Sequence, residues 1–323
     1  MTARFSRRAA LALAALPAVG SAQTVPRPQT LRIVVPFPAG GGTDILARLF
    51  GDHMAPRLGQ TVVVENRAGA GGVIGSDVVA RAAPDGGTIV FGTSSSHGIA
   101  PGLNRNMPHD VVADFTPIAL IAVNPFVLVV HPDVPARNVA ELVAYARANP
   151  GRLSYASSGN GTTPHLAAEM FRAMAGIEMV HVPYRGSPDA QPDLVSGRVH
   201  LMFDSTTTAV AQARAGRLRA LAVTSRARLP ALPEVPTMQE GGIAGYEALG
   251  WFAAFGPRGV PSEIVSRYNA AMNEIAMLPD VRERLTALGA EPLPMTPAEL
   301  AAFQRDEVRK WGDIIRAANI TAG

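Results

Sequence analysis

Short runs of apolar, often β-branched residues alternate along the chain with longer stretches whose apolar positions recur every three to four residues. The short runs predict β-strands, and the longer stretches predict amphipathic helices. Several of the runs are apolar at every position, as in parallel strands that are covered on both faces. The expected strands cover residues 31–35, 62–65, 89–92, 126–130, 153–156, 179–182, 199–203, 218–223 and 252–255.

Several helix ends can be predicted from the sequence. A helix over 43–58 would carry its apolar side chains on one face, and residues 138–141 and 296–299 have the Asn/Thr-x-x-Glu spacing of a capping box. Ser187 is followed by proline, which is typical of an N-cap before the first helical residue. The alternation of strands and helices predicts an α/β fold with doubly wound, mainly parallel sheets and flanking helices.

The length of 323 residues favours two lobes, because single hydrophobic cores stop growing at about 250–300 residues. Two extended segments flanked by proline or glycine, 115–132 and 251–257, are the expected crossings between the lobes. We therefore predict a discontinuous lobe 1 formed by residues 23–123 and 248–323. Residues 124–247 form the predicted lobe 2.

The N-terminus has the pattern of a secretory signal peptide. A basic start is followed by an apolar core at residues 9–19 and by small residues at 20–22, so we expect residues 1–22 to be removed after Ala22. The apolar core is too short to span a hydrocarbon layer of about 30 Å. The mature protein is therefore expected to be exported and soluble.

Composition excludes several functional classes. The 47% hydrophobic and 17% charged residues exclude a disordered chain, and the absence of cysteine excludes disulfides, thiolate catalysis and cysteine-ligated metals. The formal charge is 29 − 26 = +3, which becomes 26 − 26 = 0 when Arg4, Arg7 and Arg8 of the leader are removed. Nucleic acid is therefore not an expected partner, since phosphate binding needs clustered positive charge.

Five loops that follow predicted strands are rich in glycine and hydroxyl side chains, and Arg185 is the one cation in them. In open α/β sheets, ligands bind at the carboxyl ends of strands, where helix N-termini present free N–H groups. We therefore expect a small anionic or polar ligand held mainly by main-chain N–H groups and hydroxyls. The candidate ligand-binding residues are Phe37, Ala39, Gly40, Gly41, Asp44, Thr93, Ser95, Ser96, His97, Ser157, Gly159, Gly161, Thr162, Thr163, His165, Arg185 and Asp204.

These loops belong to longer motifs: PFPAGGGTDILAR, VVVENRAGAGGVIGSDVVARAAPDGGTIVFGT, SSGNGTTPHLAAE, VPYRGS and PRGVPSEIV. Their order and the similarity over residues 31–320 resemble the tripartite tricarboxylate transporter substrate receptors, also called Bug receptors. The resemblance implies a two-lobed, type II-like periplasmic binding protein that closes on a carboxylated metabolite and delivers it to a membrane permease. The loops matching 37–44, 93–97 and 157–165 would hold the carboxylate, partly through water. We expect a monomer without cofactor or metal.

Other chemistries have weaker support. GAGGVIG at 69–75 has the spacing GxGxxxG instead of the dinucleotide-binding GxGxxG, so we interpret it as a close packing of strand and helix. The alternative function is an exported serine hydrolase that uses Ser96 or Ser157 with His165, although the motif GxSxG is absent. We expect His165 to hydrogen-bond its own loop instead. Asp44 is more simply a helix cap, because a carboxylate beside an anionic ligand would repel it.

Overall fold

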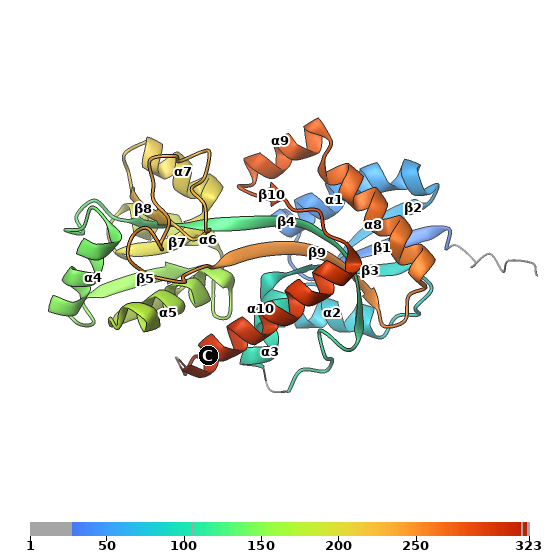
Figure 1. Cartoon of the computed structure of the whole chain (residues 1–323), viewed down its shortest axis with the longest axis horizontal. Helices are drawn as coiled ribbons and strands as arrows, with labels where there is room; N and C mark the ends of the chain where they lie inside the picture. Colours follow the sequence, from blue (N-terminus) through green and yellow to red (C-terminus); the bar gives the residue numbers. More distant parts are fainter. Residues whose placement is uncertain (1–27, 105, 318, 322–323) are drawn as a thin grey trace, which may run out of the picture.

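The computed structural model describes residues 28–104, 106–317 and 319–321, so the predicted signal peptide lies outside the described residues. Ten strands form one continuous, strongly bent sheet. Its two halves lie at opposite ends of an elongated molecule, and the long strands β4 and β9 run between them (Figure 1). Helices flank the sheet in both halves (Figure 1).

The first half of the sheet has three parallel strands, β1, β2 and β3, next to the antiparallel strands β9 and β4. The two-residue strand β10 pairs with the middle of β4. In spatial order the strands are β2 (Thr61–Asn66), β1 (Thr30–Val35), β3 (Thr88–Thr93), β9 (Leu249–Pro257), β4 (Phe115–Val130) and, beside β4, β10 (Glu291–Pro292).

The second half repeats this plan. Three parallel strands are followed by the far end of β4, which is antiparallel to its neighbours. In spatial order the strands are β6 (Met179–Pro183), β5 (Leu153–Ser157), β7 (Leu201–Ser205) and β4, which also pairs with β8 (Arg219–Val223). All nine predicted strands are present, and the antiparallel direction of β4 and β9 is the feature that the pattern did not indicate.

The helices begin close to the predicted positions. The capping boxes are confirmed: the Asn138 side chain accepts the Glu141 N–H at 2.8 Å, and Thr296 and Glu299 bond reciprocally. Ser187 is the first helical residue instead of the predicted N-cap, which is Gly186. The helices are α1 (Gly42–Leu58), α2 (Val73–Ala80), α3 (Ala100–Leu103), α4 (Val139–Ala148), α5 (Thr163–Ala175), α6 (Ser187–Val195), α7 (Thr206–Arg214), α8 (Ser262–Ala276), α9 (Pro279–Ala287) and α10 (Pro297–Ala317), with short helical turns η1 (Ala70–Gly72) and η2 (Ser95–Ile99).

Helix α10 connects the two halves of the molecule. Its N-terminal part packs beside β9 and β3, while Trp311 and Ile315 lie in the core of the second half together with Ile99. The buried carboxylate of Glu307 accepts the indole N–H of Trp251 and that of Trp311, both at 3.0 Å. Each half of the molecule is therefore completed by residues from the C-terminal helix.

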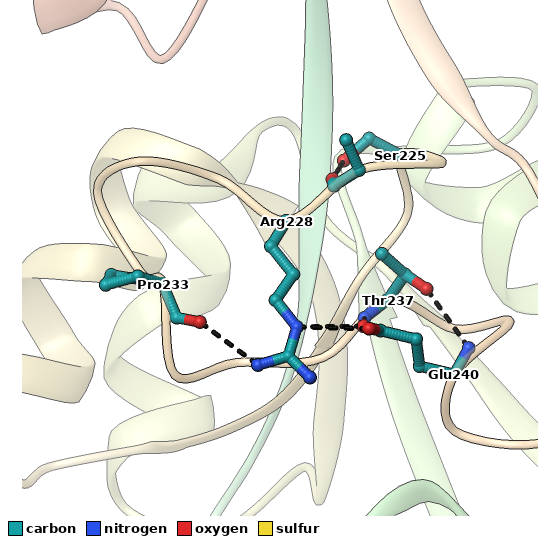
Figure 2. A network of polar contacts seen from close by, with 6 residues as sticks. Ser225, Arg228, Pro233, Thr237 and Glu240 are labelled. Atoms are coloured by element: carbon teal, nitrogen blue, oxygen red, sulfur yellow. Dashed lines mark hydrogen bonds and ion pairs between the residues drawn. The ribbon is translucent and has the colours of Figure 1, made fainter.

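A long segment without helix, residues 224–248, follows β8 and covers one end of the second half. Figure 2 shows the polar network that holds it: Arg228 contacts the Glu240 carboxylate at 2.9 Å and donates to the Pro233 carbonyl. Glu240 also accepts the Thr237 N–H at 2.7 Å. Among the described residues, no helix is long and apolar enough to span a bilayer.

Candidate functional site

The loop between β1 and α1 is shaped by the carboxylate of Asp44. One oxygen accepts the Gly40 N–H at 2.8 Å, and the other accepts the Asn66 side chain at 3.0 Å. Arg48 pairs with the same carboxylate. Burial alone would raise the pKa of Asp44, but the bonds from Arg48, Gly40 and Asn66 outweigh it and leave the pKa below its ordinary value. Asp44 thus supports the loop from the first turn of α1, while the N-cap position is Gly41, which corrects the cap interpretation.

The same loop exposes its backbone. Ala39 and Gly41 are exposed and Phe37 is half-buried, while the Gly40 N–H is already bound by Asp44. Phe37 lies against the GAGG segment, since a side chain on Gly72 would come within 3.2 Å of its ring. The available donors of this loop are therefore backbone groups at the start of α1, where the first N–H groups have no partner within the helix.

The loop after β3 is packed more tightly than expected. Ser96 and His97 are fully buried, and the Ser96 Oγ contacts both the Thr93 N–H at 3.0 Å and the His97 Nδ1 at 2.9 Å. The His97 ring stacks on Phe255 with 4.5 Å between centroids. Thr93, Ser96 and His97 hold the loop together, and Ser95 alone of this group is half-buried. A ligand contact by the three buried residues stays a prediction.

Burial also decides the protonation state of His97. It lowers the pKa of His97 to about 3, with a further contribution from nearby His109. The imidazole is therefore neutral at ordinary pH and supplies no positive charge to the site.

In the second half, the loop between β5 and α5 is closed by its own side chains. Ser157 is fully buried and its Oγ accepts the Gly159 N–H at 3.1 Å. The Thr162 hydroxyl donates to the Gly159 carbonyl at 2.7 Å, so its proton is already used. His165 Nδ1 accepts the Gly161 N–H at 3.2 Å, which confirms the expectation that this histidine binds its own loop. Ser157 and Thr162 therefore support the loop, and their contact with a ligand stays a prediction.

Asp204 lies beneath the adjacent loops. It is fully buried, and its carboxylate accepts the Ser205 N–H and the Gln191 side chain, both at 2.8 Å. Burial raises the pKa of Asp204 to about 6 against these bonds and one from Ser187. Ser187 in turn contacts Ser158 at 3.2 Å, so Asp204 holds the loops after β5 and β6 together and does not itself meet a ligand.

Arg185 differs from the two carboxylates. Its side chain is exposed in the loop between β6 and α6, and within residues 28–104, 106–317 and 319–321 it has no ion-pair partner. It is thus a free cation beside the loops of the second half. This placement is compatible with its predicted contact to an anionic ligand.

The two halves meet where these loops face each other. The hydroxyls of Ser94 and Thr163 are both buried and lie 2.8 Å apart, and a side chain on Gly161 would come within 2.8 Å of Leu103. Thr163 therefore contacts the other half of the molecule, and its role as a ligand contact stays a prediction. A cavity of about 310 Å³ opens beside this seam, and it is lined by Ala70, Gly71, Val73, Ser95, Ala100, Leu103, Asn104, Asn160 and Gly161.

The cavity contains both predicted and missed residues. Ser95 and Gly161 were predicted, whereas Ala70, Gly71 and Asn104 were not, nor was Asn160. Asn160 was detectable, because it lies inside the motif SSGNGTTPH. Ala70 and Gly71 belong to the motif interpreted as packing, and no signal in the sequence separated their exposed backbone from the buried Gly75.

Four helices that begin at these loops lack a side-chain cap. They are α1, α5, α6 and α7. Their first N–H groups remain for water or a ligand, and the helix dipoles add positive potential there. The site can therefore hold a small anion without a dense cluster of basic side chains.

The geometry argues against the two enzymatic interpretations. A side chain on Gly75 would lie 2.7 Å from both the Arg67 carbonyl and the Pro36 Cα, so this glycine serves close packing, as predicted. The oxygens of Ser96 and Ser157 are buried, and His165 bonds Gly161 instead of either serine. Among the described residues, no cluster of three or more His, Asp or Glu side chains could hold a metal ion.

Comparison with known proteins identifies the family. The model of the tripartite tricarboxylate transporter family receptor matches residues 46–320. The chain belongs to this receptor family. The predicted family is thereby confirmed, and its members are substrate receptors of the periplasm. The protein BugT of Bordetella pertussis is 38% identical over 95% of this chain and 94% of its own length.

Solved receptors of similar structure contain carboxylates. A Rhodopseudomonas palustris protein solved with adipate is 38% identical, with a TM-score of 0.81 over 91% of this chain and 99% of its own. MatC from the same organism, solved with malate, is 35% identical, with a TM-score of 0.77 over 88% and 98%. These likenesses confirm the predicted α/β receptor fold.

Proposed function

We propose that this receptor binds a small mono- or dicarboxylate between its two halves, and that it performs no chemistry on it. The observation that carries the proposal is the cavity at the seam, which loops of both halves line. Helices α1 and α5, which follow two of the predicted site loops, start with uncapped backbone N–H groups. Such groups bind carboxylates without titrating. The adipate and malate of the two related structures are anions of this class.

The proposed contacts come from both halves. Phe37, Ala39, Gly41 and Ser95 would surround the ligand from the first half, whereas the Gly40 N–H is already held by Asp44. Gly159, Asn160 and Gly161 would face it from the second half, with Arg185 as the charged partner. This set adds Asn160, which lines the cavity, to predicted residues that are exposed or half-buried. The N–H groups of Gly159 and Gly161 are already bound by Ser157 and His165.

Thermal unfolding of the mature protein in the presence of organic acids tests this proposal. Adipate or malate at a hundredfold excess over Kd should add about 2.7 kcal/mol to the free energy of unfolding, which raises Tm visibly. The acid should be recovered unchanged, and generic esters should not be hydrolysed. Stabilisation by amines or sugars but by no carboxylate would contradict the proposal, and ester hydrolysis would revive the hydrolase alternative.

We further propose that lobe 1 (23–123 and 248–323) and lobe 2 (124–247) close on the ligand by bending at the crossing strands. Asn124 of β4 pairs with Gly250 of β9 at the proposed hinge. A side chain on Gly250 would meet the Asn124 amide at 2.4 Å, so the two strands approach closely there. A ligand can favour closure only through its contacts to both lobes.

Small-angle scattering checks the closure. We expect the radius of gyration to fall when adipate or malate saturates the protein, because the Ser94–Thr163 contact then stays formed. An equal radius with and without a bound acid would contradict a hinge. Arg219→Ala, far from both the seam and the crossing, provides the control: its radius should respond to ligand as the wild type does.

The remaining parts of the proposal concern partners and location. The receptor would be exported to the periplasm after cleavage near Ala22, remain a monomer, and deliver its acid to the membrane permease subunits of a tripartite transporter. Its family membership supports this assignment. N-terminal sequencing and light scattering of the exported protein check the cleavage and the monomer.

A further inference from the structure

Three aromatic rings form a stack directly behind the β5–α5 loop. His165 of α5 lies on His181 of β6 with 4.1 Å between centroids and 9° between planes. His181 in turn lies on Tyr155 of β5 at 4.8 Å and 15°. The sequence predicted a hydrogen bond to the loop for His165 alone, and His181 has no role in the proposed ligand contacts.

Both histidines bond to this loop. His165 Nδ1 accepts the Gly161 N–H at 3.2 Å, and His181 Nε2 contacts the Ser157 Oγ at 2.7 Å. That oxygen also accepts the Gly159 N–H, so each of the two glycines of the loop is held by one histidine, directly or through one serine. Gly161 lines the cavity and touches Leu103 of the other half. The stack therefore fixes the part of the loop that faces the proposed ligand.

The observed arrangement requires a neutral His165 ring, whereas the contact between His181 Nε2 and the Ser157 Oγ allows donation in either direction. A nitrogen that accepts a backbone N–H carries no proton, whereas an imidazolium carries a proton on both nitrogens and can only donate. Protonation of His165 would place an N–H against the Gly161 N–H and break this bond. Two protonated rings 4.1 Å apart would in addition repel each other.

The charged groups around the stack do not remove this requirement. Glu169 of α5 faces the rings, but its carboxylate accepts the Tyr155 hydroxyl at 2.5 Å and pairs with Arg172. Burial is the main cause that lowers the pKa of His165 to about 4; His181 and Arg172 add to it, and Glu169 opposes it. Burial likewise lowers the pKa of His181, again against Glu169.

We propose that the neutral His165–His181 pair positions the β5–α5 loop for the ligand, and that acidification releases this loop and lowers the affinity. Only the expected loss of affinity rests on the proposed function, and the release of the loop does not. In the closed loop, the histidines form the observed bonds, and the pKa of His165 is lower there than in the open loop. The neutral histidine therefore stabilises the closed loop above its free pKa of about 6.5. This stabilisation is lost as the pH falls toward 4. Between pH 8 and 6 the loop stays closed.

The first test needs no ligand. Nitrogen NMR of the imidazoles and amide exchange at Gly159 and Gly161 are followed on the exported protein from pH 7 to 4.5. With a free pKa of about 6.5 and a closed-loop pKa of about 4, the ratio of open to closed loop should rise by on the order of 50-fold. The exchange protection of Gly161 should fall accordingly. Constant protection while His165 takes up its proton would overturn the proposal.

The second test measures the Kd for adipate and malate at pH 8, 6 and 4.5. The acids themselves take up protons near pH 4–5, so the wild type is compared with His165→Asn/His181→Gln. In this variant neutral amide oxygens replace the two ring nitrogens. We expect Kd values within about twofold between pH 8 and 6, and a loss at pH 4.5 at least threefold larger in the wild type than in the variant.

The controls separate the possible failures. His200→Gln removes a histidine that bonds Ser154 at the far end of β5, and it should keep the wild-type pH profile. Equal losses in the wild type and the double variant would overturn the proposal. So would a tenfold loss from pH 6 to 8 that disappears in His165→Gln, because His165 would then be a charged ligand contact. If neither acid binds at any pH, the proposed function fails, while the ligand-free titration still decides the role of the stack.

Discussion

Replacement of Trp311 by alanine should lower the free energy of unfolding by about 3–5 kcal/mol. The indole is fully buried in the core of the second half, although it comes from the helix that begins in the first half. Its removal leaves a large cavity, and the Glu307 carboxylate loses one of its two indole donors. Urea unfolding followed by circular dichroism measures the loss.

Trp311→Phe is the matched control. Phenylalanine keeps most of the apolar volume and removes only the N–H. It should therefore lower the free energy of unfolding by about 1–3 kcal/mol, the size of a hydrogen bond to a charged group. If the alanine and phenylalanine variants were equally unstable, the hydrogen bond to Glu307 would carry the effect instead of the packing. If both were as stable as the wild type, Trp311 would not be part of the core.

Gly75→Ala should also be strongly destabilising, with a cost at or above the upper end of about 1–3 kcal/mol for overpacking. The new methyl group would lie 2.7 Å from the Arg67 carbonyl and from the Pro36 Cα, and both are backbone atoms that no rotamer change can move. Because Pro36 begins the loop that carries Ala39 and Gly41, we expect the Kd for adipate or malate to rise as well. Denaturant unfolding and calorimetric titration measure the two effects.

Gly312→Ala provides the comparison within a helix. There the methyl group would meet only the end of the Arg316 side chain, at 3.2 Å, and this exposed side chain can move away. The substitution should be neutral or stabilise α10 by about 0.5–1 kcal/mol, since alanine favours helix more than glycine does. Similar results for both glycines would disprove the packing role of Gly75.

The regular elements could be predicted from the sequence because their signals are local. Short apolar runs, several of them continuous, identified all nine of the described strands that are longer than two residues, and the Asn138 and Thr296 capping boxes marked real helix starts. The extended segment predicted at 115–132 is confirmed by β4, but its antiparallel direction depends on pairing with β9. That pairing joins segments more than a hundred residues apart, and no local pattern records it.

The candidate site could be predicted only as a set of loops. Within such a loop, Ser95 borders the cavity while Ser96 next to it is fully buried, although both are serines after the same strand. The direction of each hydroxyl is set by partners that the sequence does not place together, such as Thr163 for Ser94. Glycine-rich composition therefore indicated loops that border the cavity, but which residues line it required coordinates.

The path of α10 also determines the order in which this protein can fold. The first hydrophobic core combines residues 31–58 with residues 254–290, and the second combines the middle of the chain with Trp311 and Ile315. Ribosomes deliver the chain from its N-terminus, and domains generally fold as units when their residues become available. Neither half of this molecule is such a unit. The cores of both halves are therefore complete only once α10 has been synthesised.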